Sequence, residues 1–146
     1  MSTTTSTEFM VIGRVRNSDN IERLIHGITE KGYTCYNFLD KPAAPSAPHL
    51  SWEEQMNILE SHEDFWNDPV HRDIFEMDMA GLKYAETIVM LLPAGLAAHM
   101  EAGAAYGLGK RLVLIGEPEK AETLYLMFSE RYPDIEAFLS TLEVHV

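Results

Sequence analysis

The feature that most constrains the fold is a regular alternation of short apolar runs with segments of helical spacing. Apolar runs at residues 9–13, 33–38, 87–92 and 111–115 have the length and the near-continuous hydrophobicity of strands buried on both faces. Strands that alternate with helices predict a parallel sheet with right-handed crossovers and helices on both faces. We therefore expect an α/β fold, a single-domain three-layer sandwich with a parallel, flavodoxin-like sheet flanked by helices.

The helices are predicted from apolar spacing and from residues that begin or end a helix. The first is capped by Ser18 or Asp19 and ended by Gly32. Further helices are predicted at residues 51–59, 69–84 and 98–108 and after Pro133-Asp134, whereas residues 122–128 fit either a helix or an irregular strand. The apolar members expected in the first helix are Ile21, Leu24, Ile25 and Ile28, and those in the 69–84 helix are Ile74, Phe75, Met79 and Leu82.

The length and composition fit one compact domain. The chain has 146 residues, of which 46% are hydrophobic and 23% charged. We expect residues 1–7 to be a disordered leader and residues 8–146 to be the domain. No apolar run is long enough to span a membrane, and the start lacks the pattern of a signal peptide. The single cysteine, Cys35, lies in an apolar run, which fits a reducing, cytoplasmic location.

The charge balance argues against polyanionic partners. Eleven Lys and Arg residues stand against 23 Asp and Glu residues, a formal net charge of −12. This charge repels nucleic acid polymers and anionic membrane surfaces, so neither is an expected partner. A small anion can still bind in a locally basic pocket.

Two loops are the candidate sites, because ligands of such sheets bind at the carboxyl ends of the strands. The loop after the first strand contains Gly13, Arg14 and Arg16. The glycine allows close approach to the backbone, and the arginines offer bidentate contacts to an anion. The pattern is neither a Walker loop nor GxGxxG, and solvated surface arginines remain the alternative interpretation.

The loop after the third predicted strand leads into a helix of small residues that carries Glu101. We expect Glu101 in the first turn of this helix, where the helix dipole favours the ionised carboxylate of a nucleophile. An ordinary acidic residue at a helix start is the alternative. His99 is expected either to line the pocket or to be structural.

A second carboxylate, Asp78, lies at the border of the apolar face of the preceding helix. A partly buried aspartate needs a partner, which makes Asp78 a candidate site residue. The alternative is a surface aspartate paired with a nearby Lys or Arg, although Glu76 fits that role better.

From Phe9 to Leu142 the pattern resembles the nucleoside 2-deoxyribosyltransferases and the related 2'-deoxynucleoside 5'-phosphate N-hydrolase. The resemblance rests on a helix Asp, an apolar strand, and then Glu101 followed by the spacing Gly-x-Ala-x-Gly-x-Gly-Lys. It implies that Glu101 attacks the anomeric carbon and that Asp78 assists at the nucleobase or orients the sugar site. It also implies that Gly13 and Arg16 hold a 5'-phosphate. The implied reaction is a double displacement that requires no metal and no cofactor.

Two departures from the family concern the sugar-binding half of the pocket. Where the family usually has Ser or Asp, six residues before the glutamate, this chain has Gly95, and no tyrosine lies between residues 9 and 16. The pocket is then either rebuilt, with Arg14 and His99 contributing, or degraded. An enzyme acting on a nucleoside or nucleotide and a nucleotide-binding module without catalysis both remain as interpretations. The resemblance also implies a homodimer or larger homo-oligomer, for which the segment with Trp52 and Trp66 is a candidate surface.

Overall fold

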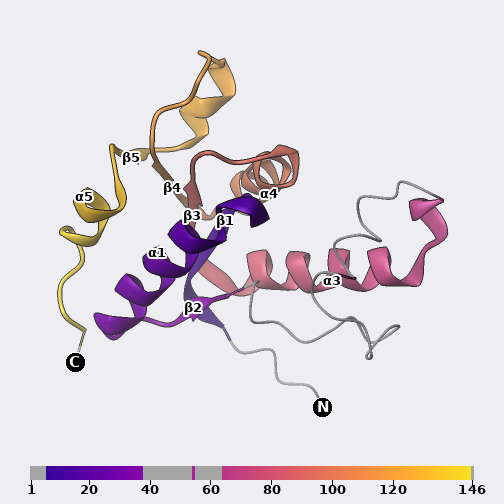
Figure 1. Cartoon of the computed structure of the whole chain (residues 1–146), viewed down its shortest axis with the longest axis horizontal. Coiled ribbons are helices and arrows are strands. Elements are labelled where there is room, and N and C mark those ends of the chain that lie inside the picture. Colours follow the sequence, from indigo (N-terminus) through magenta and orange to yellow (C-terminus); the bar gives the residue numbers. More distant parts are fainter. Residues whose placement is uncertain (1–5, 38–53, 55–63, 146) are drawn as a thin grey trace.

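A computed structural model describes residues 6–37, 54 and 64–145. Its centre is a five-stranded sheet in the order β2-β1-β3-β4-β5, in which every neighbouring pair is parallel (Figure 1). This is the strand order of a flavodoxin-like sheet, and it confirms the predicted α/β class. The strands are β1 (Thr7–Gly13), β2 (Cys35–Tyr36), β3 (Ala85–Leu91), β4 (Arg111–Ile115) and β5 (Glu130–Tyr132).

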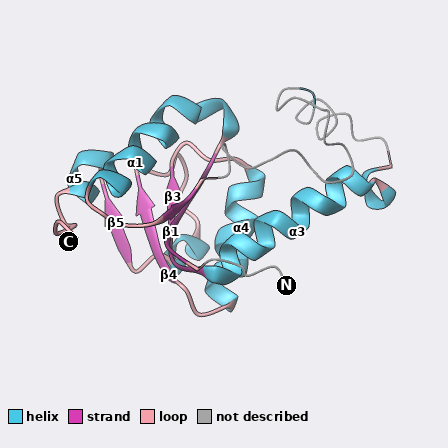
Figure 2. Cartoon of the chain, turned by 90° about the horizontal axis from the view of Figure 1, so that it is seen from below, coloured by secondary structure: helices cyan, strands magenta, loops and turns pink. Residues whose placement is uncertain are grey.

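Helices cover both faces of the sheet and complete three layers. Figure 2 shows α1 and α5 on one side of the strands and α3 and α4 on the other. Each pair of helices packs against the sheet and buries a separate apolar cluster there. The helices are α1 (Ser18–Glu30), α3 (Pro69–Tyr84), α4 (Leu96–Gly107) and α5 (Ile135–Leu139), with shorter 3-10 helices η1 (Val15–Asn17), η3 (Phe65–Asn67) and η4 (Thr123–Met127).

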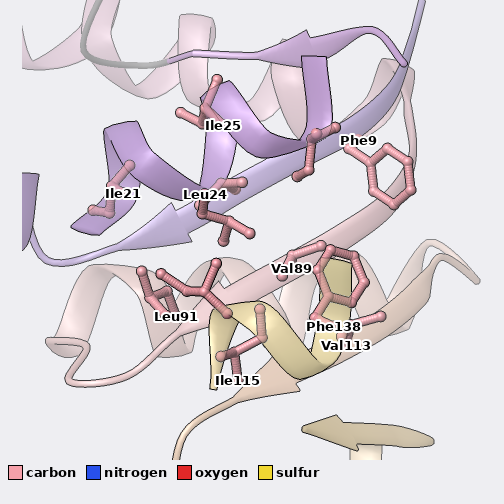
Figure 3. Close-up of a cluster of buried hydrophobic side chains, with 12 residues drawn as sticks. Phe9, Ile21, Leu24, Ile25, Val89, Leu91, Val113, Ile115 and Phe138 are labelled. Carbon is pink, nitrogen blue, oxygen red and sulfur yellow. The ribbon is translucent and has the colours of Figure 1, made fainter. Parts of the chain in front are cut away.

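The first cluster confirms the apolar stripe predicted for α1. All four predicted side chains of α1 are buried, and they meet Phe138 of α5 above β1 and β3 (Figure 3). Phe138 makes edge-to-face contacts with Phe9 and Tyr132. The helix ends at Gly32, whose φ of +95° is a conformation that suits glycine. The predicted caps were wrong, because the N-cap is Asn17 and its side chain makes no capping hydrogen bond.

The second cluster depends on the small residues of α4. Ala98, Ala102 and Ala105 are buried and bring α4 close to the sheet. Helix α4 begins at Leu96, two residues before the predicted start, and this shift changes the position of Glu101 in the helix.

Elements at the edges of the sheet differ most from the predictions. Of the strand predicted at 33–38, residue 38 lies outside the described residues, and within them the pairing with β1 is confined to Cys35 and Tyr36 of β2, at the edge of the described sheet. Strand β5, at the opposite edge, was not predicted, since its Glu-Arg-Tyr sequence has no apolar run. Of the two alternatives predicted for residues 122–128, the structure has the helix, in the form of the 3-10 helix η4 over Thr123–Met127.

Helix α3 shows a second difference. Ile74 and Leu82 are buried as predicted, but Phe75 is 54% exposed. The N-terminal part of α3 extends away from the sheet (Figure 1). The predicted helix at 51–59, the proline-containing loop at 41–48 and Trp52 lie outside the described residues.

Candidate active site

The site is at the carboxyl edge of the sheet, where β1 and β3 lie side by side. Gly13, the last residue of β1, is in register with Leu91, the last residue of β3. The chain leaves β1 toward α1 on one face and leaves β3 toward α4 on the other. Connections that diverge in this way open a crevice between the two loops. The two loops that the sequence singled out as candidate sites are therefore neighbours at this edge.

The loop after β1 is held close to β3. A Cβ atom on Gly13 would lie 3.2 Å from the carbonyl oxygen of Leu91 and 3.2 Å from Cδ1 of Ile21, so a side chain there would crowd both. The chain then turns through η1, and the side chains of Arg14 and Arg16 are exposed.

The loop after β3 brings Gly95 to Arg14. The Leu92–Pro93 peptide bond is cis, and Gly95 is the N-cap of α4 without a side-chain cap. The Nε atom of Arg14 lies 3.8 Å from the position that a Cβ atom on Gly95 would take. The predicted residues Arg14 and Gly95, 81 positions apart in the sequence, are therefore neighbours in the structure.

A cavity of about 640 Å³ opens between the loops that follow β1, β3 and β4. Arg14 and His99 lie in its wall, whereas Arg16, Asp78 and Glu101 do not. The described lining residues are Arg14, Leu92, Pro93, Ala94, His99, Gly116, Glu117, Pro118, Glu119, Lys120 and Tyr125. Its volume is in the range of small-molecule sites.

His99 is held at both ring nitrogens. Its Nδ1 atom is 2.7 Å from the carbonyl oxygen of Gly95, and its Nε2 atom is 2.9 Å from the hydroxyl oxygen of Tyr125. A carbonyl oxygen only accepts, so Nδ1 carries a proton and donates it to Gly95. In the neutral ring, Nε2 must then accept the hydroxyl proton of Tyr125. Sequence reasoning missed Tyr125, because η4 follows a different strand and reaches the cavity only through the fold.

The two predicted carboxylates both act on a residue that was not predicted. Asp78 of α3 and Glu101 of α4 are both half-buried. Burial, and then the negative charges of Asp78 and of Glu101, raise the pKa of Tyr36 to about 12. The Tyr36 ring packs on α3, with Cε1 3.2 Å from the Cβ position of Gly81. The Tyr36 hydroxyl therefore keeps its proton at neutral pH.

The structure corrects the position of Glu101. It is the sixth residue of α4, and the first turn of that helix contains no acidic residue. The helix dipole acts within the first turn, so it does not supply the stabilisation expected for the Glu101 carboxylate.

No group of three or more potential metal ligands occurs among the described residues. Of the acidic segment near residue 68, Asp68 and His71 form a 2.8 Å pair. Among all the residues that the structure describes, no helix is both long enough and apolar enough to cross a membrane.

The fold and the site at its β1–β3 edge define a flavodoxin-like α/β protein. Comparison of the sequence with protein-family models and with curated proteins finds no match. The solved structures that are similar to this chain include the following two. One is a 2-deoxyribosyltransferase from Bacillus psychrosaccharolyticus, with a TM-score of 0.62 and 13% identity over 93% of this chain and 96% of that one. The other is the CMP N-glycosidase of Clostridium botulinum, with a TM-score of 0.51 and 16% identity over 91% of this chain and 96% of that one. At such identities the likeness shows a shared fold.

Proposed function

We propose that the protein is a nucleoside 2-deoxyribosyltransferase-like enzyme that cleaves or transfers the N-glycosidic bond of a nucleoside or nucleoside 5'-monophosphate. The single observation that carries the proposal is the fold, which this chain shares with two enzymes of that chemistry. Two half-buried carboxylates from different helices, Asp78 and Glu101, support it, because the negative charges of both raise the pKa of Tyr36. The fold is shared along more than nine-tenths of the chain with two enzymes whose names state this chemistry.

The proposed mechanism is a double displacement. A carboxylate oxygen of Glu101 attacks the anomeric carbon, the C–N bond to the base breaks, and the bonding electrons leave with the base, which takes up a proton. Asp78 orients the sugar or assists at the base. Water or a second base then attacks the same carbon, Glu101 leaves, and the configuration at the anomeric carbon is retained.

We also propose that the cavity at the ends of β1, β3 and β4 receives the 5'-phosphate. The sequence pattern suggested Gly13 and Arg16 for this role, with Arg14 as a neighbour. The position of Arg14 in the cavity wall, next to Gly95, supports Arg14 as the main contact. An arginine donates charge-assisted hydrogen bonds to a phosphate oxygen and is well suited to this task.

The experiment is incubation with a panel of nucleosides, deoxynucleosides and their 5'-monophosphates, followed by chromatography of the free base. We expect base release that Glu101→Gln and Asp78→Asn each reduce by about 100-fold or more, the effect of removing a group that acts in the transition state. Glu76→Gln is the matched control, because Glu76 is exposed on the same helix as Asp78. Release that persists in Glu101→Gln contradicts the mechanism.

The alternative is a nucleotide-binding module of the same fold without catalysis. It is favoured by Gly95, which supplies no side chain where the family usually has a Ser or Asp. Thermal stabilisation by a nucleotide, with no base released from any member of the panel, establishes this alternative.

We propose, finally, that the chain forms a homodimer or a larger homo-oligomer. Several large apolar side chains are exposed, including Trp66 at 80%, Leu96 at 77% and Leu126 at 77%. A monomer mass from light scattering at micromolar concentration contradicts this proposal.

A further inference from the structure

The cavity wall contains a hydrogen-bonded pair, His99 and Tyr125, that the proposed mechanism does not use. Both side chains are half-buried, and their rings meet edge to face with centroids 5.7 Å apart. His99 is anchored by the Gly95 carbonyl oxygen at Nδ1, so its Nε2 atom is fixed toward the Tyr125 hydroxyl. The two hydrogen bonds therefore form a chain that runs from the Gly95 carbonyl oxygen through the His99 ring to the Tyr125 hydroxyl.

The protonation of His99 decides what Tyr125 offers to a ligand. When the ring is neutral, Nε2 accepts the Tyr125 proton, and only lone pairs of the hydroxyl oxygen are left for the cavity. When the ring is cationic, Nε2 donates to the Tyr125 oxygen instead. The Tyr125 hydroxyl then no longer donates its proton to His99 and can donate it to a ligand.

We propose that His99 and Tyr125 form a proton-dependent recognition pair for a phosphate group in this cavity. A phosphate oxygen is a hydrogen-bond acceptor. The lone pairs of the Tyr125 hydroxyl repel it when the His99 ring is neutral, and the Tyr125 hydroxyl donates a hydrogen bond to it when the ring is cationic. Binding of the phosphate takes up one proton at Nε2 of His99. The inference rests on the proposed function in one respect, that the phosphate belongs to a nucleoside 5'-monophosphate.

The charged groups around the cavity fit this arrangement. Arg14 reaches it from the loop after β1, and Lys120 reaches it from the loop after β4, so both can neutralise a phosphate. Glu117 and Glu119 come from the same loop as Lys120 and add negative charge to the cavity wall. The cavity wall thus contains charges of both signs. A phosphate that binds together with a proton on His99 adds less negative charge to this wall than a phosphate that binds alone.

The test uses inorganic sulfate, which has the shape of a phosphate and keeps the same charge over the pH range of histidine titration. Affinity is measured by calorimetry at constant ionic strength near about pH 5.5 and about pH 7.5, on either side of the ordinary histidine range. We expect sulfate to bind about tenfold more tightly at the lower pH, the size of one charge-assisted hydrogen bond. Measurements in two buffers of different ionisation enthalpy should show a net uptake that averages about half a proton per sulfate, which is what a tenfold change in affinity over about two pH units corresponds to.

Variants separate the pair from a general effect of pH. Tyr125→Phe keeps the ring and removes the hydroxyl, and His99→Asn keeps a donor for the Gly95 carbonyl but does not titrate. In both, the dependence of sulfate affinity on pH should disappear. His26→Asn is the matched control, because His26 is exposed on α1 and does not line the cavity, and it should retain the full dependence.

Three results overturn the inference. They are the absence of sulfate binding at both pH values, a wild-type affinity that does not change with pH, and a pH dependence that survives in Tyr125→Phe. Failure of the proposed function is separate, since it appears as an absence of base release from the nucleotide panel. If the protein releases no base but still binds sulfate with uptake of a proton, the recognition pair is supported and the proposed enzymatic function is contradicted.

Discussion

Replacement of Arg14 by alanine tests whether the loop after β1 recognises a 5'-phosphate. Arg14 lies in the wall of the cavity beside Gly95, whereas Arg16 does not line it. A charge-assisted hydrogen bond contributes about 1.5–3 kcal/mol. Because the Arg14 side chain is exposed, solvent screening places its contribution at the lower end, about 1.5 kcal/mol, which corresponds to about tenfold in affinity.

The assay compares the affinities of CMP and cytidine by calorimetry in a Glu101→Gln background, which prevents turnover. Without further changes, CMP should bind about tenfold more tightly than cytidine. Arg14→Ala should remove this preference and leave cytidine binding nearly unchanged. Arg16→Ala is the comparison variant and should lose less. If CMP keeps its advantage in Arg14→Ala, or if Arg16→Ala alone removes it, the assignment of Arg14 as the main phosphate contact is refuted.

Four further predictions concern other residues. Tyr36→Phe should lower the rate of base release by about tenfold while urea unfolding changes by less than about 1 kcal/mol, because the charges of both carboxylates act on the hydroxyl and the ring remains; an unchanged rate argues against a role for Tyr36. Phe138→Ala should reduce the free energy of unfolding by about 3–5 kcal/mol in urea titrations, since the side chain is fully buried on the face opposite α4. The Cys35 thiol, whose pKa burial raises to about 12, should resist iodoacetamide at neutral pH in the native protein and react once the chain unfolds; rapid native labelling contradicts this. Hydrogen bonds from Arg111 hold the pKa of Glu130 below its ordinary value, so the pair stabilises the fold above the unfolded-state pKa, and this contribution is lost as pH falls through the folded-state pKa; unfolding curves of wild type and Glu130→Gln should therefore converge in acid, and curves that stay apart refute the assignment.

The strands that were predicted well are those buried on both faces. β1, β3 and β4 occupy adjacent central positions, where an almost continuous apolar run is both necessary and easy to recognise. The edge strands β2 and β5 pair on one side only and need fewer apolar residues, so their lengths depend on the neighbouring strand.

The positions of the candidate site residues in the fold were predictable in part for a similar reason. Gly13 and Glu101 follow recognisable strands, and the topology of a parallel sheet brings the loops after β1 and β3 to one edge. The start of α4 was placed two residues too late, because Gly95, its N-cap, has no side chain to mark the boundary. The expected stabilisation of Glu101 by the helix dipole was wrong for that reason.

The alternation of strands and helices, the apolar stripe of α1 and the small residues that let α4 approach the sheet could be predicted from the sequence, because each is a local pattern of burial. The contacts between side chains of different elements could not. The Tyr36 ring packs on Gly81 of α3 from an edge strand, and Tyr125 of η4 bonds His99, 26 residues earlier in the chain. Such contacts depend on strand order and on the path of each connection, and the spacing of residues along one element contains no information about either.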